Sequence, residues 1–223
     1  MCIRDSSGAD LSSGHLTEAV LSMADLSDAS LISANLSQAS LRHAFLNGAD
    51  LTEANLESAD LASADLTDAV LKNANLKNIS LTGSVLKGSD LDGADLVNAI
   101  LVNAILSGAT LVKSRLTGAN LTNANLSGAT LQKADLRGTI LRGTDLSRVN
   151  LANADMTGAI LRKAILVGAD LTDAKLVDVD WRGADLSDVD LSTSRVTQAD
   201  VAHSILCGTS MPWGEENGGC EKQ

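Results

Sequence analysis

Leucine occupies every fifth position of this chain from Leu11 through Leu151 without a gap. The same register continues to residue 211, so 41 positions spaced five apart span most of the 223 residues. Five of these positions hold another apolar residue: Met156, Trp181, Val196, Val201 and Met211. This lattice leaves no room for a second domain, an inserted loop or a conventional core.

A spacing of five fits neither a helix nor a straight strand. At about 100° per residue, an α-helix would rotate successive leucines by roughly 140° and scatter them around its surface. A straight strand has a side-chain period of two, so leucines five apart would face alternate sides and half would meet water. The pattern therefore predicts a chain that bends once in every five residues.

A second inward position lies two residues before each leucine. It holds alanine at 28 of the 41 sites, and small or apolar residues at the others. The three remaining positions are mostly polar, and glycines such as Gly48 and Gly83 fall two residues after a leucine, where they mark a corner. Repetition without long-range elements predicts a solenoid whose coils share backbone hydrogen bonds with the coils above and below.

The repeat resembles the A(D/N)Lxx unit of the pentapeptide repeat family, as in ADLTD at 64–68 and ANLTN at 119–123. The resemblance covers residues 9–213 and implies an all-β fold: a right-handed quadrilateral β-helix of about ten coils with four pentapeptides each. Residues twenty apart would then stack on one face. The inward ladder would include Leu51, Leu71, Leu91, Leu111, Leu131 and Trp181.

Charge is uneven over the four faces that this winding implies. We number the faces from the leucines at 11, 16, 21 and 26, and sum the outward positions that repeat every twenty residues. Faces one and four each sum to −5, face two to −1 and face three to +2, within a total of −11. Faces four and one are neighbours, so the rod is expected to have one acidic side, to which Asp25, Asp28, Asp65, Asp68, Asp185 and Asp188 contribute.

The charge and composition argue against direct nucleic-acid binding. A basic patch is the usual footprint of a nucleic-acid-binding protein, and one Phe and two Trp offer no platform for stacking bases. An acidic rod can instead imitate the phosphates of a duplex. The family resemblance supplies a precedent, because its quinolone-resistance members are thought to act on DNA gyrase in this way. The simpler alternative is that the acidic surface maintains solubility.

Some outward positions are apolar, including Ile100, Ile105, Ile160 and Ile165. A contiguous exposed apolar surface often marks a partner site. The alternative is that these side chains lie against the rod and pack on the neighbour twenty residues away, as Ile140 and Ile160 would. Asn35, Asn55 and Asn75 would stack in the same manner, and we interpret them as a structural amide ladder.

The sequence provides no convergent catalytic or metal-binding groups. His43 and His203 share a face but lie 160 residues apart, which is eight coils or roughly 38 Å. The sequence contains no phosphate loop, CxxC pair or nucleophile elbow. No enzyme activity, cofactor or metal is therefore expected.

The two ends depart from the repeat. Residues 1–8 form an irregular leader, in which MCIRDS resembles a translated adapter scar. We therefore expect that the first coil is an uncapped edge, and that copies of the protein associate end to end through it. Residues 214–223 are expected to be a tail, because Pro212 and Gly214 stop the winding. Cys207 and Cys220 either form a bridge over the last coil or remain free thiols.

The sequence thus predicts a non-enzymatic interaction scaffold of the pentapeptide repeat type, which binds an unknown protein partner. The alternative is a DNA-mimicking modulator of gyrase or another topoisomerase. No membrane segment is apparent in this chain, and a cytoplasmic location is expected.

Overall fold

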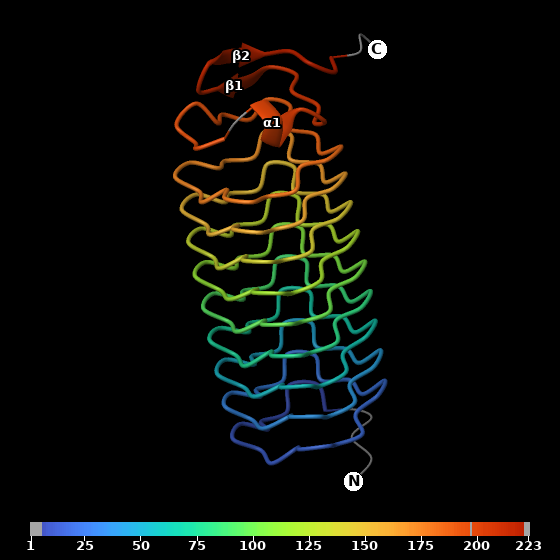
Figure 1. Cartoon of the computed structure of the whole chain (residues 1–223). Coiled ribbons are helices and arrows are strands. Elements are labelled where there is room, and N and C mark those ends of the chain that lie inside the picture. Colours follow the sequence, from blue (N-terminus) through green and yellow to red (C-terminus); the bar gives the residue numbers. More distant parts are fainter. Residues whose placement is uncertain (1–5, 197, 221–223) are drawn as a thin grey trace.

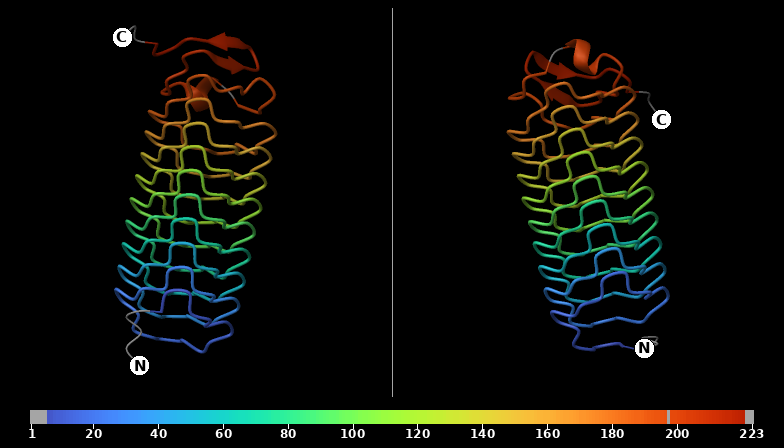
Figure 2. Two further views of the ribbon diagram at one scale, coloured as in Figure 1. Left: turned by 180° about the vertical axis from the view of Figure 1, so that it is seen from behind. Right: turned by 60° about the horizontal axis from the view of Figure 1, so that its bottom comes forward.

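The computed structural model describes residues 6–196 and 198–220. Its main body is a rod of stacked coils that rises from the N-terminal to the C-terminal end (Figure 1). Parallel bridges join residues twenty apart, from Asp10 with Ser30 to Asp190 with Ser210. Four pentapeptides therefore complete one coil, and the chain is a β-helical solenoid. Two further views show the same stacking from other sides (Figure 2).

Backbone hydrogen bonds repeat with each pentapeptide. In the middle of the rod, the N–H of Leu111 donates to the carbonyl of Thr130 at 2.7 Å, and the N–H of Thr130 donates to Ala109 at 2.9 Å. A third bond joins the N–H of Lys113 to the carbonyl of Gln132 at 3.0 Å. Each coil is thus hydrogen-bonded to the coil above it and to the coil below it, as a strand is in a parallel sheet.

The backbone conformation at the corner of each pentapeptide explains which residue types occur there. In the regular coils, the residue two after a leucine adopts a left-handed backbone, as in Gly88 with φ of 67° and Asn123 with φ of 56°. Gly, Asn and Asp tolerate this conformation best, which accounts for their frequency at the corner. Lys113 and Lys163 also adopt it, with φ of 59° and 58°, so the surrounding ladder imposes the corner on residues that do not favour it.

The core consists of the leucines and of the small residues two positions before them. The ladder residues of the sequence analysis are all buried: Leu51, Leu71, Leu91, Leu111, Leu131 and Trp181. Where Ser or Thr replaces alanine, the buried hydroxyl donates to a carbonyl. Ser114 Oγ bonds Leu111 O at 2.7 Å, and Thr144 Oγ1 bonds Leu121 O at 2.7 Å. The core therefore accepts a hydroxyl without leaving it unsatisfied.

The regular winding breaks near the C-terminal end. Among the described residues, Asp170 has no bridge to Asp190 and Lys175 has none to Arg195, although the ladder resumes at Asp185 with Ile205. A short helix, α1 (Gln198–Val201), lies within the interrupted coil. The apolar spacing of five thus continues through this segment, whereas the ladder of bridges does not. Val196 and Val201 replace leucine here, and Trp181, which precedes Val201 in its column of inward residues, is larger than leucine. The inward side chains of adjacent coils therefore differ in volume.

A hairpin follows the last coil. Strand β1 (Thr209–Met211) pairs antiparallel with β2 (Gly214–Glu216), and both lie at the C-terminal end of the rod (Figure 1). The tail expected over 214–223 thus begins with a paired strand, because Pro212 and Trp213 form a turn that returns the chain. At the other end, Ser6 and Gly8 already donate to Asp25 and Ser27 of the next coil. The described part of the expected leader 1–8 therefore follows the ladder, and residues 1–5 lie outside the described residues.

Candidate partner surface

The acidic side is built from two kinds of aspartate. Asp25, Asp65 and Asp185 directly precede a leucine, and each accepts a hydrogen bond from the backbone N–H two residues later, at 3.0, 2.9 and 3.0 Å. These Asx turns fix the carboxylates against the corner and support the bend of the chain. Aspartates at this position therefore stabilise the bend of the chain in addition to contributing negative charge.

The second kind of aspartate occupies the corner. Asp28, Asp68 and Asp188 have φ of 56°, 55° and 58°. Each side chain reaches over the corner of the next coil, where it lies against a glycine: Gly48, Gly88 and Gly208 respectively. A Cβ on Gly48 or Gly88 would overlap the carboxylate oxygen from the coil below. These glycines thus provide both the left-handed backbone and the space for a neighbouring carboxylate.

We predict that Gly88→Ala destabilises the protein more than Gly108→Ala does. Both glycines have nearly the same φ, 67° and 69°, but nothing lies within 4 Å of a Cβ on Gly108, whereas Asp68 Oδ1 blocks one on Gly88. Chemical denaturation should show a loss of about 1 kcal/mol for Gly108→Ala from the backbone alone. Gly88→Ala should cost roughly 1 kcal/mol more, because Asp68 must leave its rotamer.

The added cost should disappear when Asp68→Ala is combined with Gly88→Ala, since no carboxylate then blocks the new methyl group. Equal losses for the two single glycine variants would contradict the packing of Asp68 over Gly88.

Local hydrogen bonds keep acidic-side carboxylates ionised. The hydroxyl and the backbone N–H of Ser192 lower the pKa of Asp190, and the corresponding groups of Ser27 lower the pKa of Asp25. A carboxylate with a lowered pKa contributes to stability above its unfolded pKa, and this contribution is lost as the pH falls through the folded value. Asp25 and Asp190 therefore keep their charge at neutral and mildly acidic pH.

Apolar side chains interrupt the acidic column of face four. Bridges join Asp25 to Phe45, Phe45 to Asp65, and Ile165 to Asp185. The side chains of Phe45, Ile105 and Ile165 are 50%, 40% and 43% exposed. Charge and apolar surface therefore alternate from Asp25 to Asp65 and from Asp145 to Ile205, and the positions between these two stretches carry no charge. A DNA duplex carries a charge about every 1.7 Å along its axis, so the column does not reproduce the spacing of phosphates.

The other apolar candidates lie on face three. Ile100 is exposed, whereas Ile160 is partly buried and bridges to Ile140 in the coil below. Phe45 was not among the candidates from the sequence. Its position directly before a leucine, shared with Ile105 and Ile165, is the signal that could have identified it.

The predicted amide ladder is present on face two. Asn55 Nδ2 donates to Asn35 Oδ1 at 3.2 Å, and Asn75 Nδ2 donates to Asn55 Oδ1 at 3.0 Å. The Oδ1 atoms of Asn35 and Asn55 also accept from the backbone of their own corners. These amides are therefore engaged in structural hydrogen bonds.

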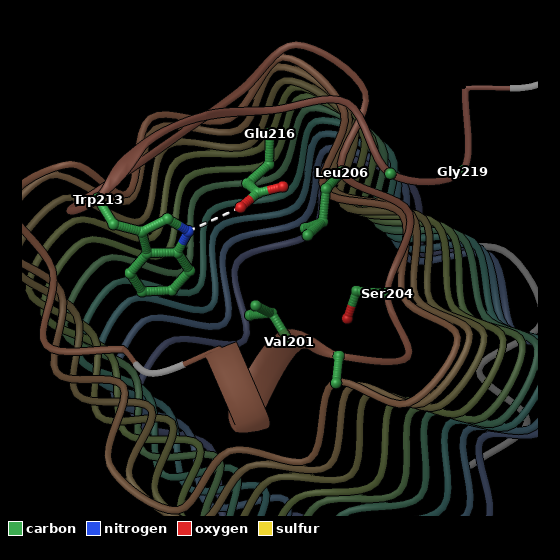
Figure 3. Close-up of a pocket in the computed structure, with 8 residues that line it drawn as sticks. Val201, Ser204, Leu206, Trp213, Glu216 and Gly219 are labelled. Carbon is green, nitrogen blue, oxygen red and sulfur yellow. Dashed lines mark hydrogen bonds between the residues drawn. The ribbon is translucent and has the colours of Figure 1, made fainter.

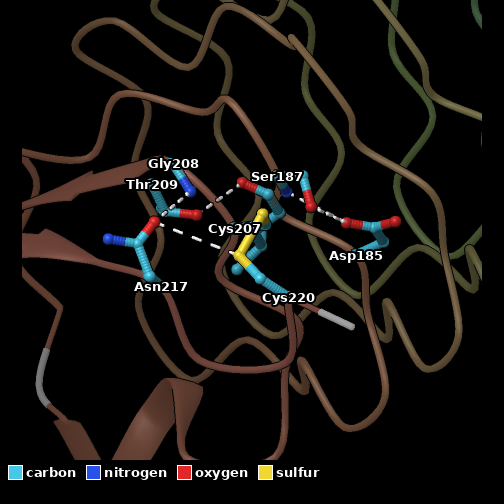
Figure 4. The surroundings of a disulfide bond; sticks show 8 residues. Asp185, Ser187, Cys207, Gly208, Thr209, Asn217 and Cys220 are labelled. Carbon is cyan, nitrogen blue, oxygen red and sulfur yellow. Dashed lines mark hydrogen bonds between the residues drawn. A yellow bond between two sulfur atoms is a disulfide. The ribbon is translucent and has the colours of Figure 1, made fainter. Parts of the chain in front are cut away.

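The C-terminal hairpin closes over the last coil. A disulfide joins Cys207 to Cys220, whose Cα atoms lie 5.1 Å apart (Figure 4). Nearby, Asn217 Oδ1 accepts from the backbone N–H of Gly208 at 3.1 Å, and the N–H of Leu206 donates to Gly218 at 2.7 Å. The bridge and these bonds hold the returning segment against the end of the rod.

A cavity of about 390 Å³ lies beneath this segment. Val201, Leu206 and Trp213 contribute its apolar lining, and Trp213 Nε1 donates to Glu216 Oε1 at 2.8 Å (Figure 3). Sequence reasoning missed this cavity, because it depends on a hairpin that departs from the repeat.

Within residues 6–196 and 198–220, no group of three or more His, Cys, Asp or Glu side chains is arranged to hold a metal ion. In the same part of the chain, no helix has the length and apolar character needed to cross a membrane.

Comparison with known proteins identifies the repeat. The family of pentapeptide repeats matches overlapping segments of the chain, at 7–42, 29–68, 64–103, 104–143, 129–168 and 164–201. Among proteins with curated descriptions, none matches this chain significantly.

Several solved structures are similar to the chain. HetL, a pentapeptide repeat protein involved in heterocyst differentiation regulation in the cyanobacterium Nostoc sp. strain PCC 7120, is 38% identical; the match covers 80% of this chain and 83% of HetL, with a TM-score of 0.44. A pentapeptide repeat protein from the Arabidopsis thaliana thylakoid lumen is 31% identical over 48% of this chain and 68% of its own, with a TM-score of 0.33.

QnrB1, a plasmid-mediated fluoroquinolone resistance protein, is 17% identical; the match covers 63% of this chain and 76% of QnrB1, with a TM-score of 0.34. Because the matched repeats extend from residue 7 to residue 201, the chain belongs to the pentapeptide repeat family.

Proposed function

We propose that this protein is a non-enzymatic scaffold for protein interaction, built on a right-handed quadrilateral β-helix of about ten coils. The observation that carries the proposal is the column on face four where fixed carboxylates alternate with exposed apolar side chains, as at Asp25, Phe45 and Asp65. The ladder holds these groups at fixed heights, so a partner that binds them meets a preorganised surface.

The partner that fits this surface is a protein with both apolar and basic side chains. Asp25, Asp65 and Asp185 form no ion pair with Lys or Arg among the described residues, so their charge is available to a partner. Pull-down from a bacterial lysate at low and high salt tests the nature of the contact. Retention of a partner at high salt supports an interface with an apolar centre, whereas complete loss indicates an electrostatic one.

The second candidate is a DNA mimic that modulates gyrase or another topoisomerase. It is favoured by the same carboxylates, together with Asp28, Asp68 and Asp188 at the corners of face four. It is disfavoured by the apolar side chains of Phe45 and Ile105, which place uncharged surface between the acidic rungs.

We predict that the purified protein inhibits gyrase supercoiling weakly or not at all, because the acidic column is discontinuous. A supercoiling assay measures this directly. Potent inhibition that is abolished by the combined change of Asp65, Asp68, Asp185 and Asp188 to Asn would instead establish the mimic. The same change at Asp10, Asp50, Asp90 and Asp170 of face one, the other half of the acidic side, shows whether inhibition depends on face four in particular or on the total charge.

The disulfide bears on the location of the protein. The sequence favours the cytoplasm, where thiols are kept reduced, but a bridge between Cys207 and Cys220 persists in oxidising compartments. Counting free thiols in protein isolated from its native cell distinguishes the two locations.

A further inference from the structure

Three arginines form a column on face three. Arg142, Arg162 and Arg182 each follow a buried residue of the lattice, on three consecutive coils. Backbone bonds join these rungs: the N–H of Gly143 donates to Arg162 O at 2.9 Å, and the N–H of Lys163 donates to Arg182 O at 3.0 Å. The rungs are therefore about 4.8 Å apart. Like charges on adjacent strands repel one another, so such a column requires nearby anions.

One aspartate forms ion pairs with two of the three arginines. Asp180 Oδ2 lies 2.5 Å from Arg162 Nε and 2.7 Å from Arg182 Nη2, and Asp180 Oδ1 accepts from Arg182 Nε at 2.8 Å. In the described part of the chain, Arg142 and Lys163 pair with no carboxylate. Four cations and one carboxylate leave a net charge of +3 on this patch, although the whole chain carries −11.

The two uncompensated cations border a surface groove. Its volume is about 510 Å³, and its lining comprises Asn120, Thr122, Asn123, Ile140, Arg142, Gly143 and Lys163. The amides and the hydroxyl offer hydrogen bonds, while Ile140 supplies an apolar contact. The absence of a side chain at Gly143 leaves space beside Arg142. The groove thus combines positive charge with the polar and apolar groups that a peptide requires.

We propose that this groove binds a short acidic segment of a partner protein, with Arg142 and Lys163 as its carboxylate-binding residues. Arg binds carboxylates bidentately, and a charge-assisted hydrogen bond is about twice as strong as a neutral one. Carboxylates on one side of an extended peptide lie about 6.6 Å apart, a spacing that two cations on adjacent coils can meet. This surface differs from face four, on which the scaffold proposal rests.

Charge favours a protein segment over a nucleic acid. The arginine column extends over two rung steps, or about 10 Å, and the adjacent face four sums to −5. A nucleic-acid strand that continued along the column would meet Thr122 and Val102 instead of further cations, and one that turned onto face four would meet acidic surface. A segment with two or three carboxylates ends within the patch, and charges beyond about 8 Å are largely screened at physiological salt.

The test uses a labelled peptide of three Glu-Ala repeats, with a Gln-Ala peptide of the same length as the uncharged control. Fluorescence anisotropy at low salt should show binding of the acidic peptide only. The double variant Arg142→Gln with Lys163→Gln should weaken binding by at least about tenfold. Asp180→Asn should strengthen it by about threefold or more, because it releases Arg162 and Arg182 for the peptide.

The matched control is Lys113→Gln with Lys133→Gln. These lysines also occupy consecutive coils and pair with no carboxylate in the described residues, but they lie on face one. This pair should change affinity by less than about twofold. Equal weakening by both double variants, or no binding by the unmodified protein, would overturn the proposal. Tighter binding of a labelled single-stranded oligothymidylate, lost in the Arg142 and Lys163 variant, would replace the acidic segment by a phosphate backbone.

Discussion

Leu111→Asp is expected to remove at least about 4 kcal/mol from the free energy of unfolding. Leu111 is fully buried in the middle of the rod, between Leu91 and Leu131 of the adjacent coils. The variant loses the packing of a leucine and places a carboxylate where no cation can reach it. Because each coil contacts only its neighbours, the damage should also separate the two halves of the rod. Circular dichroism during urea denaturation measures the loss.

Lys113→Asp is the matched control for this variant. It introduces the same carboxylate on the same coil, two residues away, at an exposed corner with φ of 59°. Aspartate adopts this conformation at Asp28 and Asp68, so the control should change stability by less than about 0.5 kcal/mol. A loss below about 1 kcal/mol for Leu111→Asp would contradict the inward assignment of the leucines.

The regular part of the fold could be predicted because its signal is local and repeated. One pentapeptide such as ADLTD specifies an inward pair, Ala64 and Leu66, and a corner at Asp68. The spacing of five did not indicate how many residues complete one coil. The number twenty came from the family resemblance. The bridges between residues twenty apart are consistent with it.

The end of the rod could not be predicted because it depends on contacts outside the repeat. Val196 and Val201 keep the spacing of five, so the pattern continues across the segment that forms α1. The return of the chain through β2 depends on the turn at Pro212 and Trp213, and on the disulfide between Cys207 and Cys220. The spacing of apolar residues indicates which side chains point inward, but it does not indicate where the backbone bridges between coils are interrupted.

The partner surfaces were only partly accessible to sequence reasoning. Summing charges by face predicts an acidic side and gives a positive sum for face three. The sums did not show that Asp180 pairs with both Arg162 and Arg182 while Arg142 remains unpaired. Ion pairing depends on the direction of long side chains across coils, which the spacing of residues does not specify.

Trp181→Ala is expected to cost about 3 to 5 kcal/mol, the range for truncation of a buried aromatic side chain. Trp181 is 1% exposed and belongs to the last coil before the ladder is interrupted. The missing indole should leave a cavity that Val201, the next residue of its column, is too small to fill. We therefore expect the last coil, α1 and the hairpin to loosen together, which thermal denaturation and hydrogen exchange can follow.

The second tryptophan supplies both the control and an optical readout. Trp213 is 39% exposed and lies in the turn of the hairpin, so Trp213→Ala should cost less than about 1.5 kcal/mol, chiefly the hydrogen bond to Glu216. Each variant leaves a single indole. Emission from the Trp213→Ala protein should report the buried Trp181 at short wavelength, and emission from the Trp181→Ala protein should report the more exposed Trp213 at longer wavelength. Equal stability losses, or emission in the reverse order, would show that Trp181 does not fill the core of the last regular coil.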